Sequence, residues 1–268
     1  MKRTSLSYLA CPTCHGELAL TMGQDARIKT GSLFCATCNK TYPVRQGIPY
    51  FIQYRELSAT NQRFARLYDW FSIVYRLYSR VAFAFLGGED RCRGGLIDRL
   101  ELKGSGERVL EVSIGPGVNL PCLMPRGAGE VAGLDISLGQ LQRCLSYARS
   151  HKWDPELFLG NAESLPFQDS AFDCVLHFGG INFFSEKRRA IEEMIRVARP
   201  GTKIVIGDET EKGAKFYEKT LPGFKSSFKE GRASVTAPVD LVPAGMLDVR
   251  CEAIWGGWFY CLEFRKPG

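Results

Sequence analysis

Four cysteines near the start of the chain form two pairs with the same internal spacing. Cys11 and Cys14 make the first pair, Cys35 and Cys38 make the second, and twenty residues separate them. Each pair can turn two thiolates toward one point, and a connecting hairpin brings the second pair opposite the first, as a tetrahedral zinc site requires. We therefore predict an N-terminal zinc ribbon. Because all four ligands would come from the protein, its Zn²⁺ ion would be structural and not catalytic.

Downstream of about residue 96, apolar runs alternate with segments of helical periodicity. Strands are expected at 108–112, 130–134, 157–159, 173–178 and 203–207, with a closing pair of strands at 247–265. Helices are expected after Ser137 and Ser185, which we interpret as N-caps, and Pro200 and Gly201 would stop the second helix. This order predicts an α/β fold with a Rossmann-like doubly wound sheet, mostly parallel, with an antiparallel C-terminal edge.

In such a sheet, a ligand binds at the carboxyl ends of the strands. Gly115 and Gly117 follow the first expected strand, where glycines let a ligand approach the backbone closely. Asp135 ends the second strand, where a carboxylate can accept hydrogen bonds from both hydroxyls of a ribose. A dinucleotide site would require a third glycine at position 120, which is Leu120 here.

Four segments carry a family resemblance: 111–117, Asp135, 160–173 and 196–201. In this order and spacing they resemble the class I S-adenosylmethionine-dependent methyltransferases, and within them the quinone-methylase-like group. Residues 6–52 resemble the small zinc-ribbon modules that are fused or bound to methyltransferases. The resemblance implies S-adenosylmethionine as cofactor and transfer of its methyl group by in-line displacement.

The resemblance also implies a set of binding residues. They are Glu111, Ser113, Gly115, Gly117, Asn119, Asp135, Ile136, Asn161, Ala162 and His177. The loop 111–117 would hold the methionine part of the cofactor, Asp135 the ribose, and Ile136 the adenine. His177 would line the sulfonium and is our candidate for a catalytic base. Ser113 stands where the family has glycine, and Asn161 stands where it usually has an acid.

We expect three segments: a zinc-ribbon module at 1–55, a helical aromatic cap or linker at 56–95, and the methyltransferase domain at 96–268. The net charge is +6, and residues 1–55 contribute +5 of it. Two acceptors remain open. The first is a small, largely apolar molecule under the aromatic helix expected at 58–86. The second is an RNA base, with the basic ribbon as a clamp. A third hypothesis makes the chain a zinc-dependent, non-catalytic partner of another enzyme.

The distribution of cysteines and apolar residues bears on the location expected for the protein. The other six cysteines are scattered along the chain, which favours reduced thiols and a cytoplasmic location. The start of the sequence lacks the pattern of a signal peptide, and no apolar run reaches transmembrane length. We therefore expect no stable membrane insertion.

Overall fold

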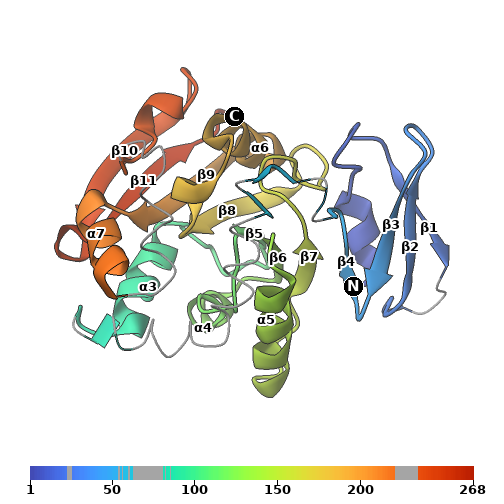
Figure 1. Cartoon of the computed structure of the whole chain (residues 1–268), viewed down its shortest axis with the longest axis horizontal. Helices are drawn as coiled ribbons and strands as arrows, with labels where there is room; N and C mark the ends of the chain where they lie inside the picture. The colour runs from blue at the N-terminus through green and yellow to red at the C-terminus, as the bar shows by residue number, and fades with distance from the viewer. Residues whose placement is uncertain are drawn as a thin grey trace.

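A computed structural model gives the fold. It describes residues 1–22, 26–53, 55, 57–59, 61–62, 81, 83–84, 86–220 and 235–268. Most of the aromatic segment at 58–86 lies outside the described residues, as does part of the segment between 210 and 246. A large sheet flanked by helices forms the main body, and a small antiparallel sheet stands at one end of it (Figure 1).

The large sheet has seven strands in the order β10-β11-β9-β8-β5-β6-β7. The strands are β5 (Arg108–Val112), β6 (Glu130–Asp135), β7 (Glu156–Leu159), β8 (Phe172–Phe178), β9 (Ala198–Glu209), β10 (Leu247–Ile254) and β11 (Phe259–Arg265). Strands β5 to β9 pair in parallel, whereas β11 pairs antiparallel with both β9 and β10. The expected doubly wound sheet with an antiparallel C-terminal edge is thus confirmed.

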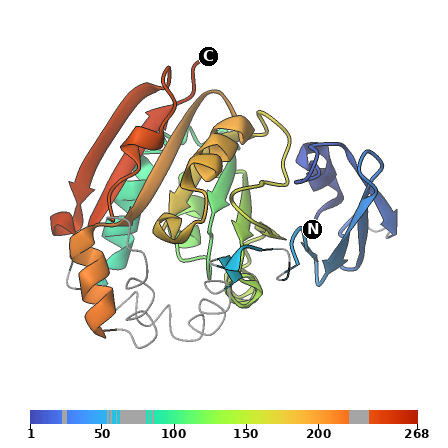
Figure 2. The same cartoon turned by 45° about the horizontal axis from the view of Figure 1, so that its top comes forward.

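Helices cover both faces of this sheet (Figure 2). They are α3 (Glu89–Asp98), α4 (Leu120–Leu123), α5 (Leu138–Ser150), α6 (Lys187–Val197) and α7 (Glu211–Thr220). Short 3-10 helices also occur: η1 (Arg3–Tyr8), η3 (Met124–Arg126), η4 (Ile181–Phe183), η5 (Val239–Leu241) and η6 (Trp255–Gly257). The apolar sides of α3, α4 and α5 share one core cluster, and α6 belongs to the cluster on the other face. None of the described helices combines the length and the apolar character needed to traverse a bilayer.

One of the two expected helix caps is correct. Ser137 caps α5, because its hydroxyl accepts a hydrogen bond from the amide of Gln140 at 3.1 Å. The cap expected at Ser185 is wrong: α6 begins at Lys187 after an uncapped Glu186. The Ser185 hydroxyl instead donates to the side chain of Asn61 at 3.0 Å, so a tertiary contact replaces the cap.

The N-terminal module is an antiparallel sheet in the order β1-β2-β3-β4. Its strands are β1 (Leu18–Met22), β2 (Gly31–Cys35), β3 (Lys40–Arg45) and β4 (Ile48–Pro49). The chain leaving β4 runs beside the large sheet. Tyr50 pairs in parallel with Leu159 at the end of β7, and the amide of Phe51 donates to the carbonyl of Leu159 at 2.8 Å. The ribbon therefore covers the edge strand of the large sheet, an edge that would otherwise expose unpaired backbone groups.

Aromatic side chains join the ribbon to the main body in one continuous core. The ring of Tyr8 lies 6.2 Å from that of Phe167, and the ring of Phe51 lies 5.1 Å from Tyr42 and 6.5 Å from Phe158. All five side chains are buried. The small sheet is thus part of the hydrophobic core and not a module attached by a linker.

Candidate functional site

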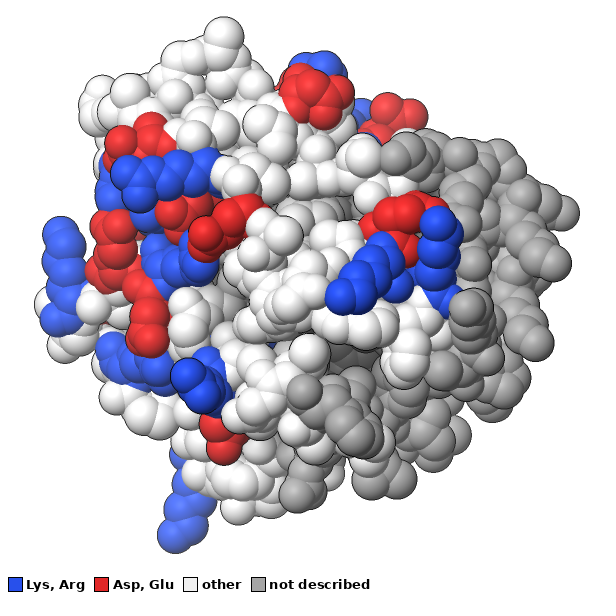
Figure 3. All heavy atoms as spheres, turned by 90° about the vertical axis from the view of Figure 1, so that its left-hand side faces the viewer, with Lys and Arg blue, Asp and Glu red and all other residues white. Residues whose placement is uncertain are grey.

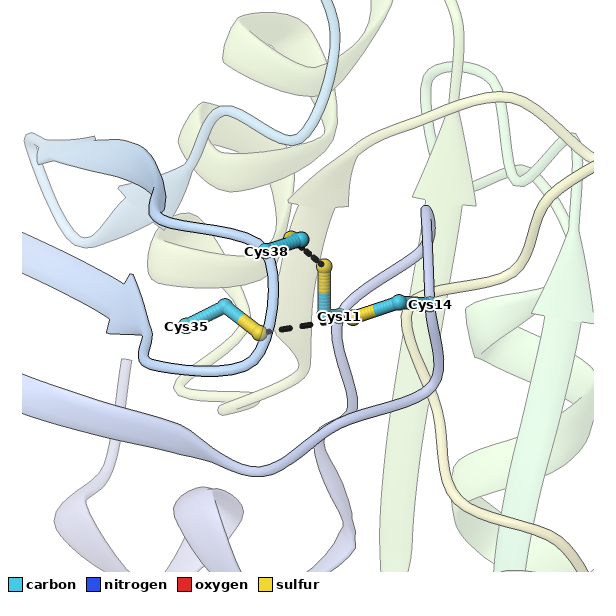
Figure 4. A group of neighbouring side chains, drawn as sticks. All are labelled: Cys11, Cys14, Cys35 and Cys38. Atoms are coloured by element: carbon cyan, nitrogen blue, oxygen red, sulfur yellow. Dashed lines mark hydrogen bonds between the residues drawn. The ribbon is translucent and has the colours of Figure 1, made fainter.

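The four N-terminal cysteines converge (Figure 4). Their Sγ atoms all lie within 4.8 Å of one another, and the Cys11–Cys38 and Cys14–Cys35 Sγ pairs are both 3.5 Å apart. Zn–S bonds of about 2.3 Å place the sulfurs of a tetrahedral site about 3.8 Å apart, so the arrangement suits a zinc ion. The hydroxyl of Tyr42 lies 3.1 Å from the Cys11 Sγ and can donate to a thiolate there.

The loop after β5 turns sharply through residues with positive φ. Ser113, Gly115 and Gly117 have φ of 62°, 55° and 77°. A β-carbon at Gly117 would lie 2.8 Å from the Cys144 Sγ, so this position requires glycine for packing. A β-carbon at Gly115 would meet nothing within 4 Å among the described residues, which leaves space for a ligand beside the backbone. Ser113 adopts a left-handed backbone conformation, which is strained for residues other than glycine.

Asp135, at the end of β6, connects this loop to the neighbouring strand. One carboxylate oxygen accepts from the amide of Gly115 at 2.8 Å, and the other accepts from the amide of Ser137 at 2.9 Å. Asp135 thus ties the loop after β5 to Ser137, the residue that caps α5. Ile136 follows and is half-buried.

After β7, Asn161 turns its side chain back on its own loop. Its Oδ1 accepts from the amide of Glu163 at 3.1 Å, and its Nδ2 lies 3.4 Å from a carboxylate oxygen of Glu163. Ala162 between them is buried. The strand register brings the ends of β5, β6, β7 and β8 side by side, so the predicted residues of all four loops lie along one edge of the sheet.

Glu111 and Asn119 belong to a row of buried, hydrogen-bonded side chains whose third member, Arg93, was not predicted from the sequence. The Asn119 amide donates to one oxygen of Glu111 at 2.6 Å, and its carbonyl accepts from Arg93 at 2.9 Å. Arg93 also binds Glu89 at 2.7 Å. The two residues are four apart on α3, so the pair is visible in the sequence. Such pairs usually face solvent, however, and nothing in the sequence signals that Arg93 is buried.

His177, at the end of β8, is completely buried. Its Nδ1 lies 3.0 Å from the carbonyl of Val112 and must therefore carry the proton, which leaves Nε2 as an acceptor without a partner among the described residues. Burial lowers the pKa of His177 to about 4, so the ring is neutral at physiological pH and is a weak base. It packs against Phe184, on the opposite face of the sheet from the neighbouring Phe178.

Two acidic residues end β9. Asp208 is buried and accepts from the amides of Gly180, Asn182 and Glu209 at 3.2, 2.9 and 2.9 Å, so it holds the loop after β8 in place. Burial, followed by the nearby charge of Asp208, raises the pKa of Glu209 well above its usual range. These residues organise the backbone next to His177.

An aromatic cluster packs together at the same edge of the sheet, on the α3 face. It consists of Phe83, Phe178, Trp255 and Phe259. Ring centroids lie 4.9 to 6.2 Å apart. Arg93 connects the cluster to Asn119, at the end of the loop after β5: its guanidinium stacks on Phe83 at 4.7 Å and on Phe178 at 5.2 Å, and it donates to Asn119.

Comparisons with known proteins agree with this geometry. A family of methyltransferase domains matches residues 110–206, and the family of Trm112p-like proteins matches residues 2–47. The demethylmenaquinone methyltransferase of Renibacterium salmoninarum is 33% identical over 47% of this chain and 48% of its own length. The chain thus spans about half the length of this relative. The phosphatidylethanolamine N-methyltransferase of Cereibacter sphaeroides is 31% identical over 60% of this chain and 81% of its own length.

Solved structures share the fold. The cyclase SpnF superposes with a TM-score of 0.59 at 20% identity and covers 78% of this chain and 97% of its own. A chain from the complex of the Haloferax volcanii Trm112 methyltransferase activator with a methyltransferase has a TM-score of 0.56 at 19% identity, over 75% of this chain and 98% of its own. From the strand order, the loop after β5 and these relatives, we conclude that the chain belongs to the class I S-adenosylmethionine-dependent methyltransferases and carries an N-terminal zinc-ribbon domain of the Trm112p-like type.

Proposed function

We propose that the chain transfers a methyl group from S-adenosylmethionine to a small, largely apolar acceptor. The observation that carries this proposal is the aromatic cluster of Phe83, Phe178, Trp255 and Phe259 beside the cofactor loop. Clustered aromatic side chains suit contact with an apolar molecule. The names of the relatives, a quinone and a phospholipid methyltransferase, support the same class of acceptor.

The cofactor, when bound, supplies an activated methyl group, so the protein contributes mainly position and a dry site. We propose that the backbone around Gly115 and the carboxylate of Glu111 receive its methionine part. Asp135 would accept from the ribose hydroxyls, and Ile136, Asn161 and Ala162 would surround the adenine. The open space at Gly115 and the unpartnered, buried Oε2 of Glu111 support this arrangement.

His177 remains our candidate for a side chain at the reacting end of the site, at the end of β8 but on the opposite face of the sheet from Phe178 and the aromatic cluster. Since its pKa is lowered to about 4, we propose that it acts as a neutral hydrogen-bond acceptor through Nε2, and that it removes no proton from a weakly acidic acceptor.

We further propose that Cys11, Cys14, Cys35 and Cys38 hold a structural zinc ion. Of the three expected segments, 1–55, 56–95 and 96–268, we propose that the first and the last fold as one unit. The shared aromatic core and the pairing of Tyr50 with Leu159 support this role for the ribbon.

The charge of the ribbon weighs against the RNA alternative. Arg27 and Lys2, two of its basic residues, pair with Asp154 of the main body, and Arg27 also lies 3.8 Å from Glu156. These cations therefore help to hold the ribbon in place. At the end of the molecule opposite the ribbon, acidic and basic side chains are interspersed, with no large area of one sign in view (Figure 3).

The test is transfer of label from methyl-labelled S-adenosylmethionine by the zinc-loaded protein in a cell extract. We expect label in the organic phase, insensitive to ribonuclease, and no label with the Asp135→Ala variant. Label that disappears with ribonuclease would contradict the apolar acceptor and favour RNA. Binding of the cofactor without any labelling would favour a non-catalytic partner.

A further inference from the structure

A completely buried arginine stands between the cofactor loop and the aromatic cluster. The side chain of Arg93, on α3, is 1% exposed. Its Nε binds Glu89 at 2.7 Å, and its Nη1 donates to the carbonyl of Asn119 at 2.9 Å. The rings of Phe83 and Phe178 both lie against the guanidinium. Arginine suits this position because its planar fork can bind two acceptors while its faces stack on aromatic rings.

The contact with Arg93 fixes which way the Asn119 amide points. Because Oδ1 of Asn119 accepts from the guanidinium, Nδ2 must face the other way, where it donates to Oε1 of Glu111 at 2.6 Å. The second oxygen of Glu111, Oε2, is buried and has no partner in the described part of the chain. A buried carboxylate oxygen without a hydrogen-bond partner lowers the stability of a folded protein unless a ligand donates a hydrogen bond to it.

We propose that Arg93 is a positioning residue of the cofactor site: it orients Asn119, and through that amide it holds Oε2 of Glu111 toward the ammonium of the cofactor's methionine part. The inference rests on the proposed function, because the role of Glu111 does. It adds a residue that is outside the loop 111–117 and does not touch the cofactor itself.

The charges around Glu111 follow from this arrangement. The pKa of Glu111 is raised to about 8, mainly by burial; the hydrogen bond from Asn119 and then the charge of Arg93 oppose this rise, and the charge of Asp135 adds a smaller upward effect. Loss of the Arg93 charge must therefore raise the pKa of Glu111 further. The carboxyl group is then protonated over a wider pH range and attracts a cationic ligand less.

The same side chain joins both halves of the site. Phe83 and Phe178 belong to the aromatic cluster that we assign to the acceptor, and Asn119 closely follows the loop 111–117 that we assign to the cofactor. Arg93 packs between them. A variant that keeps the charge but loses the fork, Arg93→Lys, therefore separates the electrostatic contribution from the geometric one.

The experiment has two arms, and both use the full chain with zinc. In the first arm no cofactor is present, and unfolding free energy is measured against pH for wild type and Arg93→Met, each compared with its Glu111→Gln counterpart. Between pH 5 and 9, wild type should lose stability relative to Glu111→Gln as pH rises, because its folded state binds the extra proton. In the Arg93→Met background this loss should extend to higher pH.

The second arm measures the dissociation constant of S-adenosylhomocysteine from pH 6 to 9 by calorimetry. At pH 7.5, Arg93→Met should bind about tenfold more weakly than wild type, as expected for one lost hydrogen bond to a charged group, and the acid limb of its profile should move to higher pH. Arg93→Lys should keep the pH profile close to that of wild type but bind more weakly. The matched control is Arg91→Met, on the exposed side of α3, which should differ from wild type by less than about twofold.

The outcomes are distinct. No binding by wild type, with the expected stability profiles, would contradict the proposed function and leave the link between Arg93 and Glu111 standing. Binding by wild type with a pH profile that Arg93→Met does not shift would overturn the positioning role. Equal weakening at every pH, or equal weakening by Arg91→Met, would do the same.

Discussion

The contact between the ribbon and the main body gives a sharp prediction for the variant Phe51→Ala. Phe51 is 4% exposed and packs between Tyr42 of the ribbon and Phe158 of β7, with ring centroids 5.1 and 6.5 Å away. Removing a buried phenylalanine ring costs about 3–5 kcal/mol, including the cavity it leaves. In a chain of this size that should lower the melting temperature by about 10 °C.

The assay follows two signals during one urea titration: far-ultraviolet circular dichroism, which is dominated by the large domain, and zinc release to a chromogenic chelator, which reports on the ribbon. Because one core spans both parts, we expect both midpoints to fall together in Phe51→Ala. The control is Phe216→Ala, since Phe216 is 42% exposed and touches Trp258 with one ring edge. Its unfolding free energy should change by at most about 1 kcal/mol.

One result would refute the reasoning. If Phe51→Ala released zinc at a lower urea concentration while the circular dichroism midpoint stayed at the wild-type value, the ribbon would unfold separately. The shared core would then contribute nothing measurable to the large domain.

Three further predictions follow. Ser113→Gly should raise the unfolding free energy by about 1 kcal/mol in urea titrations, because it removes the left-handed strain at φ 62°; no gain would mean that Ser113 is held by a compensating contact. Wild type should lose stability as pH falls from 6.5 to 4, because the unfolded histidine binds a proton that the buried His177 excludes; in His177→Asn this loss should be smaller by up to about 3 kcal/mol. Unfolding free energies of the two proteins that fall in parallel over this pH range would contradict this. Cys14→Ser, or a strong chelator, should lower the melting temperature of the whole chain in calorimetry, and a loss confined to a small separate transition would count against a structural zinc ion in a shared core.

Much of the fold could be predicted because its signals are local. Apolar runs such as 108–112 became β5 with the same bounds, and the Ser137 cap was correct because its hydrogen bond spans three residues. The Ser185 cap failed because a contact with Asn61, far away in the sequence, engages the hydroxyl. Strands β3 and β4 carried little pattern of their own and form by pairing with β2 and with each other.

The site shows the same division. The glycines of the loop after β5 and Asp135 could be recognised because their types and spacing reflect backbone geometry at strand ends. Arg93 could not, since its burial depends on Phe83 and Phe178 meeting it from two different elements. The basic charge of the ribbon was similarly ambiguous in the sequence, and the structure pairs Lys2 and Arg27 with Asp154 of the main body.

The most direct test of the central claim is a calorimetric titration of the zinc-loaded chain with S-adenosylhomocysteine, for wild type and for Asp135→Ala. The site at the ends of β5 and β6 predicts one binding site per chain in wild type. It also predicts an affinity at least tenfold lower in Asp135→Ala, with the melting temperature of the variant measured alongside. Equal affinity in the two proteins would contradict the assignment of this edge of the sheet as the cofactor site.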